Sequence, residues 1–326
     1  MRILVTGGAG FIGSNFVRRI ADNSLSGISS VIVLDKLTYA GVLANLETIE
    51  GLNGFCFAEG DICSAKLVSE LLVDVDAIVN FAAESHVDRS IGSAAEFVQT
   101  NVRGVQVLLD AIKASGRKIR FIQVSTDEVY GSIESGSWIE ESPLMPNSPY
   151  SATKAGGELV ARAYHKTYGL DVMITRCSNN YGSHHFPEKL IPLFVTNLLE
   201  GKKVPVYGNG KNVRDWLHVD DHCRGIHKVL MNGRSGEVYN IGGGRELTNN
   251  EITSLILSAM GKDESSIAYV EDRKGHDLRY SVDWTKINNE LGYEPQVEFE
   301  DGLRDTIKWY RDNEAWWKPL KERAGF

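Results

Sequence analysis

Several absences limit what the chain can be. None of its apolar stretches is long enough to cross a bilayer, and 35 Lys and Arg against 43 Asp and Glu give a net charge of −8. Because nucleic acids and anionic membranes bind basic faces, we expect neither as a partner. The four cysteines form no C-x-x-C pair and no signal-peptide run precedes the first apolar strand, so a reducing cytoplasm is the expected setting.

Short apolar strands instead alternate with helical patterns through the first half of the chain. The strands are expected at 2–6, 31–34, 55–57, 77–80, 121–126 and 170–177, with helices between them that include 64–72 and 94–114. This alternation predicts an α/β fold with a doubly wound parallel sheet of the Rossmann type. After residue 177 shorter elements follow, up to a last amphipathic helix at 303–317.

Three glycines follow the first strand. Gly7, Gly10 and Gly13 allow a tight turn, and the helix that begins beside them offers its N-terminus to a pyrophosphate. The spacing is G-x-x-G-x-x-G rather than G-x-G-x-x-G. Its place between a strand and a helix favours dinucleotide binding over a purely structural turn.

Acidic and small residues at the next strand ends agree with a dinucleotide. Asp35 follows the glycines by about 20 residues, where a carboxylate holds a ribose 2′-hydroxyl, which favours NAD over NADP. Lys36 would tolerate a phosphate, but Asp35 should repel it. Asp61 is a candidate for the adenine amino group and also for the N-cap of the following helix. Ala82 and Ala83 let a dinucleotide pass close to the backbone.

These motifs divide the chain into two predicted domains. Residues 1–177 form an NAD-binding Rossmann domain, with later returns near 213–245. Residues 178–212 and 246–326 form a smaller α/β domain for the substrate. A content of 42% hydrophobic residues supports a core in both.

A hydroxyl, a phenol and an ammonium stand close together in the sequence around residues 125–154. Ser125 and Thr126 end a central strand, at the edge where open α/β sheets bind ligands. Tyr150 and Lys154 are four residues apart, on one face of a helix that Pro149 can open. A cation near a phenol favours the phenolate, which can act as a base. A lone Tyr-x-x-x-Lys is more often an ordinary helix face, but the upstream hydroxyls favour a reaction centre.

Two adjacent carboxylates, Asp127 and Glu128, directly follow these hydroxyls. Neighbouring carboxylates repel, which raises one pKa and leaves a protonated acid beside an ionised base. The alternative is a solvated acidic turn or a helix N-cap at Asp127. The Tyr/Lys pair favours the acid/base interpretation.

No metal site is predicted. His184 and His185 are adjacent, and His218 and His222 are four residues apart, but neither pair has the partners that complete a tetrahedral site. The segment from His218 is better explained as a strand end that runs into a capped helix.

Together these segments resemble the dTDP-glucose 4,6-dehydratase family within the extended short-chain dehydrogenases/reductases. The resemblance covers essentially the whole chain and is carried by the segments 7–13, 35–41, 82–89, 125–131, 150–154, 178–182 and 187–190. Related sugar-nucleotide epimerases typically lack the Asp127–Glu128 pair, and related decarboxylases usually keep only the Glu. Lys274, and Ser183 with His184, depart from the family pattern on the substrate side.

The resemblance implies roles for named residues. The implied catalytic residues are Thr126, Asp127, Glu128, Tyr150 and Lys154. The implied cofactor-binding residues are Gly7, Gly10, Phe11, Ile12, Gly13, Asp35, Lys36, Leu37, Thr38, Asp61, Ile62, Ala82, Ala83, Ser85, Thr100, Ser125, Tyr150, Lys154, Cys177 and Asn180. The implied substrate-binding residues are Ser85, His86, Thr126, Asn179, Glu188, Lys189, Leu190, Pro205, Tyr207, Arg214, Asn249, Arg273 and His276.

The implied reaction on dTDP-glucose starts with C4 oxidation by bound NAD+, with Tyr150 taking the O4 proton. Glu128 then removes the C5 proton while Asp127 protonates the departing C6 hydroxyl, and hydride returns to C6. Arg214 is the best diphosphate candidate, with a salt bridge to Asp215 or Glu188 as its structural alternative and Arg279 as a weaker second choice.

Other interpretations stay open at this stage. The nearest is a UDP-sugar 4-epimerase or another NAD-dependent sugar-nucleotide enzyme, and the more distant one is an idle NAD-binding regulatory protein. We also expect a homodimer joined through the helices 94–114 and 149–168.

Overall fold

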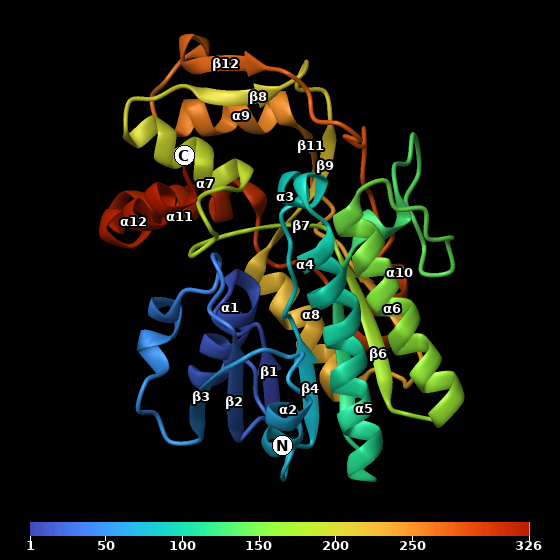
Figure 1. Cartoon of the computed structure of the whole chain (residues 1–326). Coiled ribbons are helices and arrows are strands. Elements are labelled where there is room, and N and C mark those ends of the chain that lie inside the picture. The colour runs from blue at the N-terminus through green and yellow to red at the C-terminus, as the bar shows by residue number, and fades with distance from the viewer. Residues whose placement is uncertain (326) are drawn as a thin grey trace.

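The computed structural model describes residues 1–325 and has a seven-stranded, fully parallel sheet as its centre (Figure 1). Across the sheet the strands are β10 (Val238–Ile241), β6 (Val172–Cys177), β5 (Arg120–Thr126), β4 (Ala77–Asn80), β1 (Arg2–Thr6), β2 (Ser30–Asp35) and β3 (Phe55–Glu59). The order reverses between β1 and β4, which is where open α/β sheets bind their ligands. The predicted doubly wound sheet is confirmed.

Helices cover both faces of this sheet because its strands carry apolar residues on both sides. Ile3 and Val5 of β1 pack with α1 (Phe11–Ala21), α8 (Val219–Asn232) and α10 (Thr285–Leu291). Leu4 faces the other way, toward α2 (Ala65–Leu71), α5 (Val105–Ser115) and α6 (Pro149–Tyr168). Burial on both faces is typical of parallel sheets.

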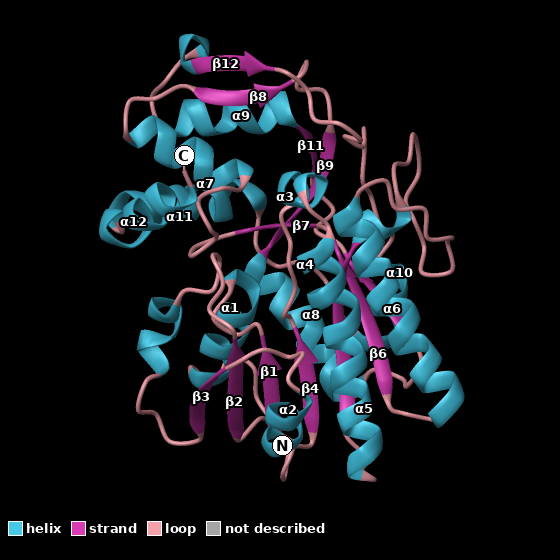
Figure 2. Ribbon diagram, viewed as in Figure 1, coloured by secondary structure: helices cyan, strands magenta, loops and turns pink. Residues whose placement is uncertain are grey.

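A smaller layer lies beyond the carboxyl ends of the strands, at the top of Figure 2. It contains a three-stranded sheet of β11 (Glu246–Thr248), β9 (Val213–His218) and β7 (Asn179–Tyr181), and a pair of β12 (Ile267–Val270) and β8 (Val204–Tyr207). Its helices are α7 (Leu190–Leu199), α9 (Asn249–Ala259), α11 (Phe299–Asp312) and α12 (Glu314–Ala324). These elements share an apolar core of their own.

One long helix prediction is confirmed with a local change, and another is wrong. The helical segment expected at 94–114 is continuous through α4 (Ala95–Val98), a π-helical turn (Gln99–Gly104) and α5, and is preceded by an unexpected α3 (Val87–Gly92). The last helix, expected at 303–317, is two helices that meet at Asn313. The Asn313 side chain donates to the Trp309 carbonyl at 2.8 Å, so it competes with the helical backbone.

Two N-cap alternatives are also wrong. Ser64, not Asp61, precedes α2, and the Asp61 carboxylate instead accepts the Cys63 N–H at 2.8 Å. The short 3₁₀ helix Asp127–Tyr130 is capped by Thr126, whose hydroxyl accepts the Glu128 N–H at 3.3 Å.

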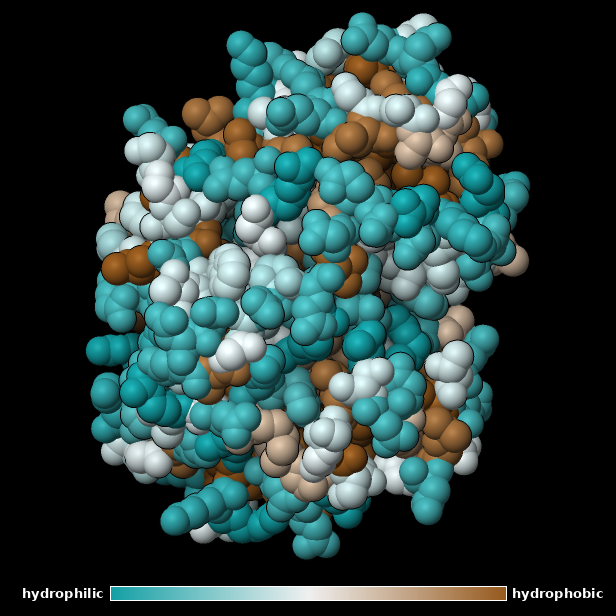
Figure 3. Space-filling model, turned by 180° about the vertical axis from the view of Figure 1, so that it is seen from behind, coloured by the Kyte–Doolittle hydropathy of each residue, from teal (hydrophilic) through white to brown (hydrophobic). Residues whose placement is uncertain are grey.

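The rear face of the molecule is mostly polar. Figure 3 shows hydrophilic side chains over most of the rear face, with hydrophobic side chains in smaller groups. No helix within residues 1–325 has both the length and the apolar character needed to cross a membrane. Phe326, the last residue of the predicted substrate domain, lies outside the described residues.

Candidate active site

The glycine turn between β1 and α1 forms the floor of a long cavity. Gly7 has a φ of +67°, and a Cβ atom there would lie 2.5 Å from the backbone nitrogen of Ala82. A Cβ atom on Gly13 would lie 2.3 Å from the Gly7 carbonyl oxygen. Gly10 precedes α1 without a side-chain cap, so the first N–H groups of this helix are left for a ligand. The turn therefore fits a pyrophosphate.

Asp35 is held rigidly where β2 ends. Its carboxylate accepts the N–H of Ala9 at 2.9 Å and the N–H of Leu37 at 2.8 Å. Burial raises the pKa of Asp35, and these backbone hydrogen bonds oppose the rise. The next cation, Lys36, forms an ion pair with Asp61 at 2.8 Å. The Lys36 charge is therefore matched by a carboxylate, which fits NAD better than a phosphorylated NADP.

Leu37 does not line the cavity, unlike the other residues predicted to bind the cofactor. Its φ of +52° turns the chain sharply, and its side chain packs against the core on the α1 face of the sheet. Its contribution to the site is therefore its N–H, which fixes Asp35. The position of Leu37 in the motif does not show whether it contacts the cofactor directly or only fixes Asp35 through its N–H.

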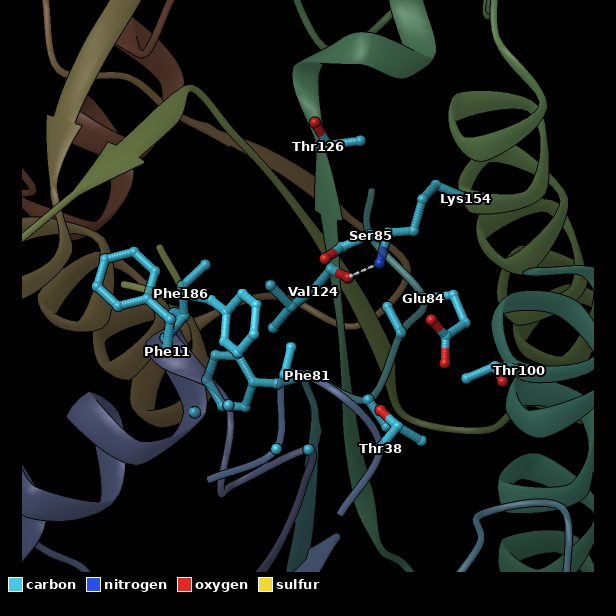
Figure 4. Close-up of a pocket in the computed structure, with 18 of the residues that line it drawn as sticks. Phe11, Thr38, Phe81, Glu84, Ser85, Thr100, Val124, Thr126, Lys154 and Phe186 are labelled. Carbon is cyan, nitrogen blue, oxygen red and sulfur yellow. Dashed lines mark hydrogen bonds between the residues drawn. The ribbon is translucent and has the colours of Figure 1, made fainter. Parts of the chain in front are cut away.

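Side chains from helices, from loops and from strand β5 converge on the cavity, as Figure 4 shows. Phe11 and Phe186 lie on one side of it, and Glu84 and Thr100 lie on the other. The apolar rings and polar groups thus occupy opposite walls. Such a cavity suits an elongated ligand with aromatic and polar parts.

The reaction centre lies where β5 ends beside α6. A reciprocal hydrogen-bond pair between Ser148 and Ser151 caps α6, so Tyr150 enters the cavity from the first helical turn. The Lys154 ammonium donates to the Val124 carbonyl at 2.7 Å, rather than to the phenol (Figure 4). Burial lowers the pKa of Lys154 to about 8.

The surroundings of Tyr150 favour its neutral phenol form. Burial raises its pKa well above the usual range, the charges of Glu128 and Asp127 raise it further, and a hydrogen bond with Thr126 opposes the rise. Deprotonation of Tyr150 therefore requires positive charge in the same cavity. Lys154, which also lines the cavity, is a nearby source.

The two neighbouring carboxyls have different surroundings. Burial raises the pKa of Asp127 well above its usual range, and the charge of Glu128 raises it further. Burial also raises the pKa of Glu128, but Arg214, Lys189 and Arg273 oppose this shift. The arrangement therefore favours a protonated Asp127 beside an ionised Glu128, as an acid and a base require.

Five buried polar atoms along the cavity make no hydrogen bond within residues 1–325. They are Ser125 Oγ, Asp127 Oδ2, Asn179 Oδ1, His185 Nδ1 and Glu188 Oε2. Buried polar atoms normally have partners, and each unpaired one carries a cost. Ligand groups are suitable partners here, so the residues present fit a bound nucleotide and a hydroxylated substrate.

A second cavity opens between the large sheet and the smaller layer. Every residue predicted to bind the substrate lines it, except Thr126, which borders the first cavity. Glu128 borders both cavities, so it stands where a cofactor and a substrate would meet. Tyr207 is 37% exposed, and the guanidinium of Arg273 lies 5.4 Å from the centre of its ring.

Arg214 is buried beneath the second cavity. Its guanidinium donates to the Val213 carbonyl at 2.7 Å and the Asp277 carbonyl at 3.0 Å. The structural alternative of a salt bridge is wrong, because neither Asp215 nor Glu188 lies within ion-pair distance of it. Arg279 pairs with Glu246 at 2.7 Å and does not line either cavity, so it is not a diphosphate ligand here.

Glu188 is the centre of a charged group at the junction of the cavities. It accepts the Tyr39 hydroxyl at 3.0 Å and lies 3.6 Å from Arg89, 3.7 Å from His86 and 3.9 Å from Lys189. Burial raises its pKa, and the cations oppose the rise. Tyr39 and Arg89 lie in the segments 35–41 and 82–89, but they were not predicted as site residues, because a motif does not show which of its side chains will contact a residue as distant in sequence as Glu188.

Within residues 1–325 there is no group of three or more His, Cys, Asp and Glu side chains that could hold a metal ion. His185 stacks on Phe11 with ring centroids 4.1 Å apart, and His184 packs against Trp309 at 4.3 Å. These histidines are aromatic packing partners.

Comparison with known proteins agrees with this geometry. The family model described as GDP-mannose 4,6 dehydratase matches residues 4–306. A dTDP-glucose 4,6-dehydratase from Streptomyces niveus is 60% identical over 324 residues, which is 98% of this chain and 96% of that protein. The chain belongs to the dTDP-glucose 4,6-dehydratase family. The enzymes of this family are NAD-dependent hydro-lyases.

Solved structures in the dTDP-glucose 4,6-dehydratase family have the same fold. DesIV from Streptomyces venezuelae, solved with NAD and dTDP bound, is 61% identical with a TM-score of 0.97, and the alignment covers 98% of this chain and all of that one (100%). A UDP-glucose 4-epimerase from Thermotoga maritima has a TM-score of 0.88 at 32% identity, covering 96% of this chain and 100% of its own. Epimerases therefore share this fold, so the fold alone does not distinguish a dehydratase from an epimerase. The residues of the site have to make that distinction.

Several residues that line the cavities of this dTDP-glucose 4,6-dehydratase family member were not predicted. Those of the first cavity include Phe81, Glu84, Val124, His185 and Phe186, and those of the second include Asp88, Lys203, Trp216, Asp277 and Tyr280. Four of them, Phe81, Glu84, Val124 and Asp277, directly flank predicted residues in the sequence. Their closeness in sequence to a motif was the one feature that could have identified them as site residues. It does not show which neighbours of a motif face the cavity.

Proposed function

We propose that this chain is a dTDP-glucose 4,6-dehydratase in which the carboxyls that follow β5 perform the water elimination. The observation that carries the proposal is the asymmetric pair of Asp127 and Glu128. One carboxyl is buried with an unpaired oxygen, and three cations stabilise the charge of the other. A 4-epimerase has no elimination step that would use such a pair.

The first step is C4 oxidation. Bound NAD+ supplies the hydride acceptor at this step and the hydride donor at the last one. Thr126 positions the O4 hydroxyl, and Tyr150 removes its proton. Burial alone opposes formation of the Tyr150 phenolate. The positive charge of Lys154 favours the phenolate and so makes it accessible.

The second step is elimination across C5 and C6. The ketone at C4 acidifies the C5 hydrogen, so Glu128 can take it as a proton while Asp127 donates its own proton to the C6 oxygen. Water leaves, and a C5–C6 double bond forms. Glu128 then returns a proton to C5 as the hydride reaches C6, which gives the 4-keto-6-deoxy sugar.

The second cavity supports the binding of the nucleotide part. We assign Arg214 to the diphosphate, because its buried guanidinium lines the second cavity, is held by backbone carbonyls and forms no ion pair with Asp215 or Glu188. In this proposal residues 1–177, with returns near 213–245, bind NAD, and 178–212 with 246–326 bind the nucleotide sugar. Four free cysteines support the proposed cytoplasmic setting.

The decisive test is mass spectrometry of the purified protein incubated with dTDP-glucose and no added cofactor. We expect a nucleotide sugar that is lighter by one water, together with NAD released from the denatured protein. UDP-glucose serves as the parallel substrate. Formation of the C4 epimer without water loss, even after NAD+ is added, would contradict the dehydratase proposal.

The homodimer is a further part of the proposal. Val98 on α4 and Leu159 and Tyr168 on α6 are 50%, 55% and 48% exposed, which favours a partner on this side. We expect a dimer in sedimentation at micromolar concentration, and dissociation to monomers in Leu159→Arg. Ile139→Arg, at a similarly exposed position (48%) in the loop after β5, should leave the dimer intact. A monomeric wild-type protein would contradict this assembly.

A further inference from the structure

Asn45 connects three parts of the chain that are distant in sequence. It is only 2% exposed and uses both ends of its side-chain amide. Its Nδ2 donates to the Ala9 carbonyl at 3.0 Å, and its Oδ1 accepts the indole N–H of Trp316 at 3.0 Å. Its backbone carbonyl accepts Arg18 Nη1 of α1 at 2.9 Å.

The Ala9 end of this connection lies in the glycine turn. Ala9 donates its N–H to Asp35, and its carbonyl also accepts the N–H of Val42 at 3.0 Å. Ala9 is therefore fixed from both sides, between the predicted pyrophosphate and ribose contacts. Asn45 joins this floor of the cofactor cavity to the segment 38–46.

The same segment forms a wall of the cofactor cavity, through Thr38, Ala40 and Gly41. The C-terminal helix α12 holds this wall at two points. Trp316 donates to Asn45, and Arg323 donates to the Tyr39 carbonyl at 2.6 Å. Figure 1 shows α12 directly above the segment between β2 and β3.

We propose that α12 is a latch that retains NAD, with the hydrogen bond from Trp316 to Asn45 as its positioning contact. This inference rests on the proposed function. In that function the oxidised sugar must wait for the hydride to return, so early loss of the cofactor would strand it. Release of NAD requires the wall 38–46 to move away from the glycine turn, and this movement breaks the bonds of Asn45.

The matched variants are Trp316→Phe and Trp309→Phe. Phenylalanine keeps an aromatic ring at position 316 but leaves the buried Asn45 Oδ1 without a donor, which weakens the closed wall. Trp309 packs beside Trp316 at 5.0 Å, and its indole N–H makes no hydrogen bond within residues 1–325. Trp309→Phe therefore also removes an indole N–H, but it leaves the hydrogen bond from Trp316 to Asn45 in place.

The experiment measures the rate at which bound NAD leaves the purified holoenzyme after dilution into a trap that removes free NAD. We expect Trp316→Phe to release NAD on the order of tenfold faster, and Trp309→Phe to release it at the wild-type rate. Hydrogen exchange of residues 38–46 should rise in Trp316→Phe alone. Turnover of this variant should depend on added NAD+ and recover with it.

A second variant tests the other side of the link. Asn45→Asp keeps an acceptor for Trp316 but places an oxygen against the Ala9 carbonyl, so it should also accelerate NAD release. Equal release rates in wild type, Trp316→Phe and Asn45→Asp would overturn the latch, as would equal acceleration in Trp309→Phe. A wild-type protein that holds no NAD and forms no water-loss product would instead overturn the proposed function.

Discussion

Replacing Glu128 by glutamine lowers the rate of water loss from dTDP-glucose by about 10²- to 10⁴-fold, while C4 oxidation continues. Glutamine has nearly the shape of glutamate but cannot accept the C5 proton. The oxidation step depends on Tyr150 and Thr126, whose groups are unchanged. The variant should therefore stop after the first step and hold its cofactor in the reduced form.

Two measurements separate the steps of Glu128→Gln. Absorbance of reduced nicotinamide should accumulate during a single turnover, because hydride leaves C4 but is not returned. In deuterated water the wild-type product should carry deuterium at C5, whereas the sugar recovered from the variant should not. Accumulated reduced nicotinamide shows that C4 oxidation has taken place, and the missing deuterium shows that the C5 proton has not been removed.

The matched control is Glu134→Gln, the same change at an exposed position of the following loop. It should behave as the wild type in both measurements. Asp127→Asn should also slow water loss, but exchange at C5 should persist because Glu128 is still present. Equal loss of oxidation and elimination in Glu128→Gln would contradict the assigned roles.

The sequence carried enough information for the parts of this site that lie in short, continuous segments. The glycine turn, Asp35 and the Tyr150/Lys154 pair all follow from local patterns, since each motif belongs to one strand end or one helix face. The parallel sheet follows as well, because βαβ alternation leaves few topologies. Strand ends that meet at one edge of a sheet then place these motifs together.

Contacts between distant segments could not be predicted in this way. Trp316 and Asn45 are 271 residues apart, and neither belongs to a recognisable motif. The break at Asn313 depends on a single side-chain hydrogen bond, which an amphipathic pattern does not reveal. Likewise the backbone role of Leu37 depends on its positive φ, a property that the residue type disfavours.

Replacing Tyr150 by phenylalanine should abolish the reaction at its beginning, with a loss of about 10²- to 10⁴-fold in C4 oxidation. The change removes one oxygen atom from a side chain that is only 9% exposed, so the fold and the packing against Phe97 should persist. No reduced nicotinamide should accumulate. This absence distinguishes Tyr150→Phe from Glu128→Gln, in which it does.

Tyr168→Phe is the matched control, because it makes the same change at the exposed end of the same helix, far from the cavities. Its oxidation rate should equal that of the wild type. The double variant shows which of the two steps comes first. Tyr150→Phe combined with Glu128→Gln should resemble Tyr150→Phe alone, because without C4 oxidation no ketone forms to acidify C5. Accumulation of reduced nicotinamide in the double variant would show that another group takes the O4 proton, and Lys154 would then be the first residue to test.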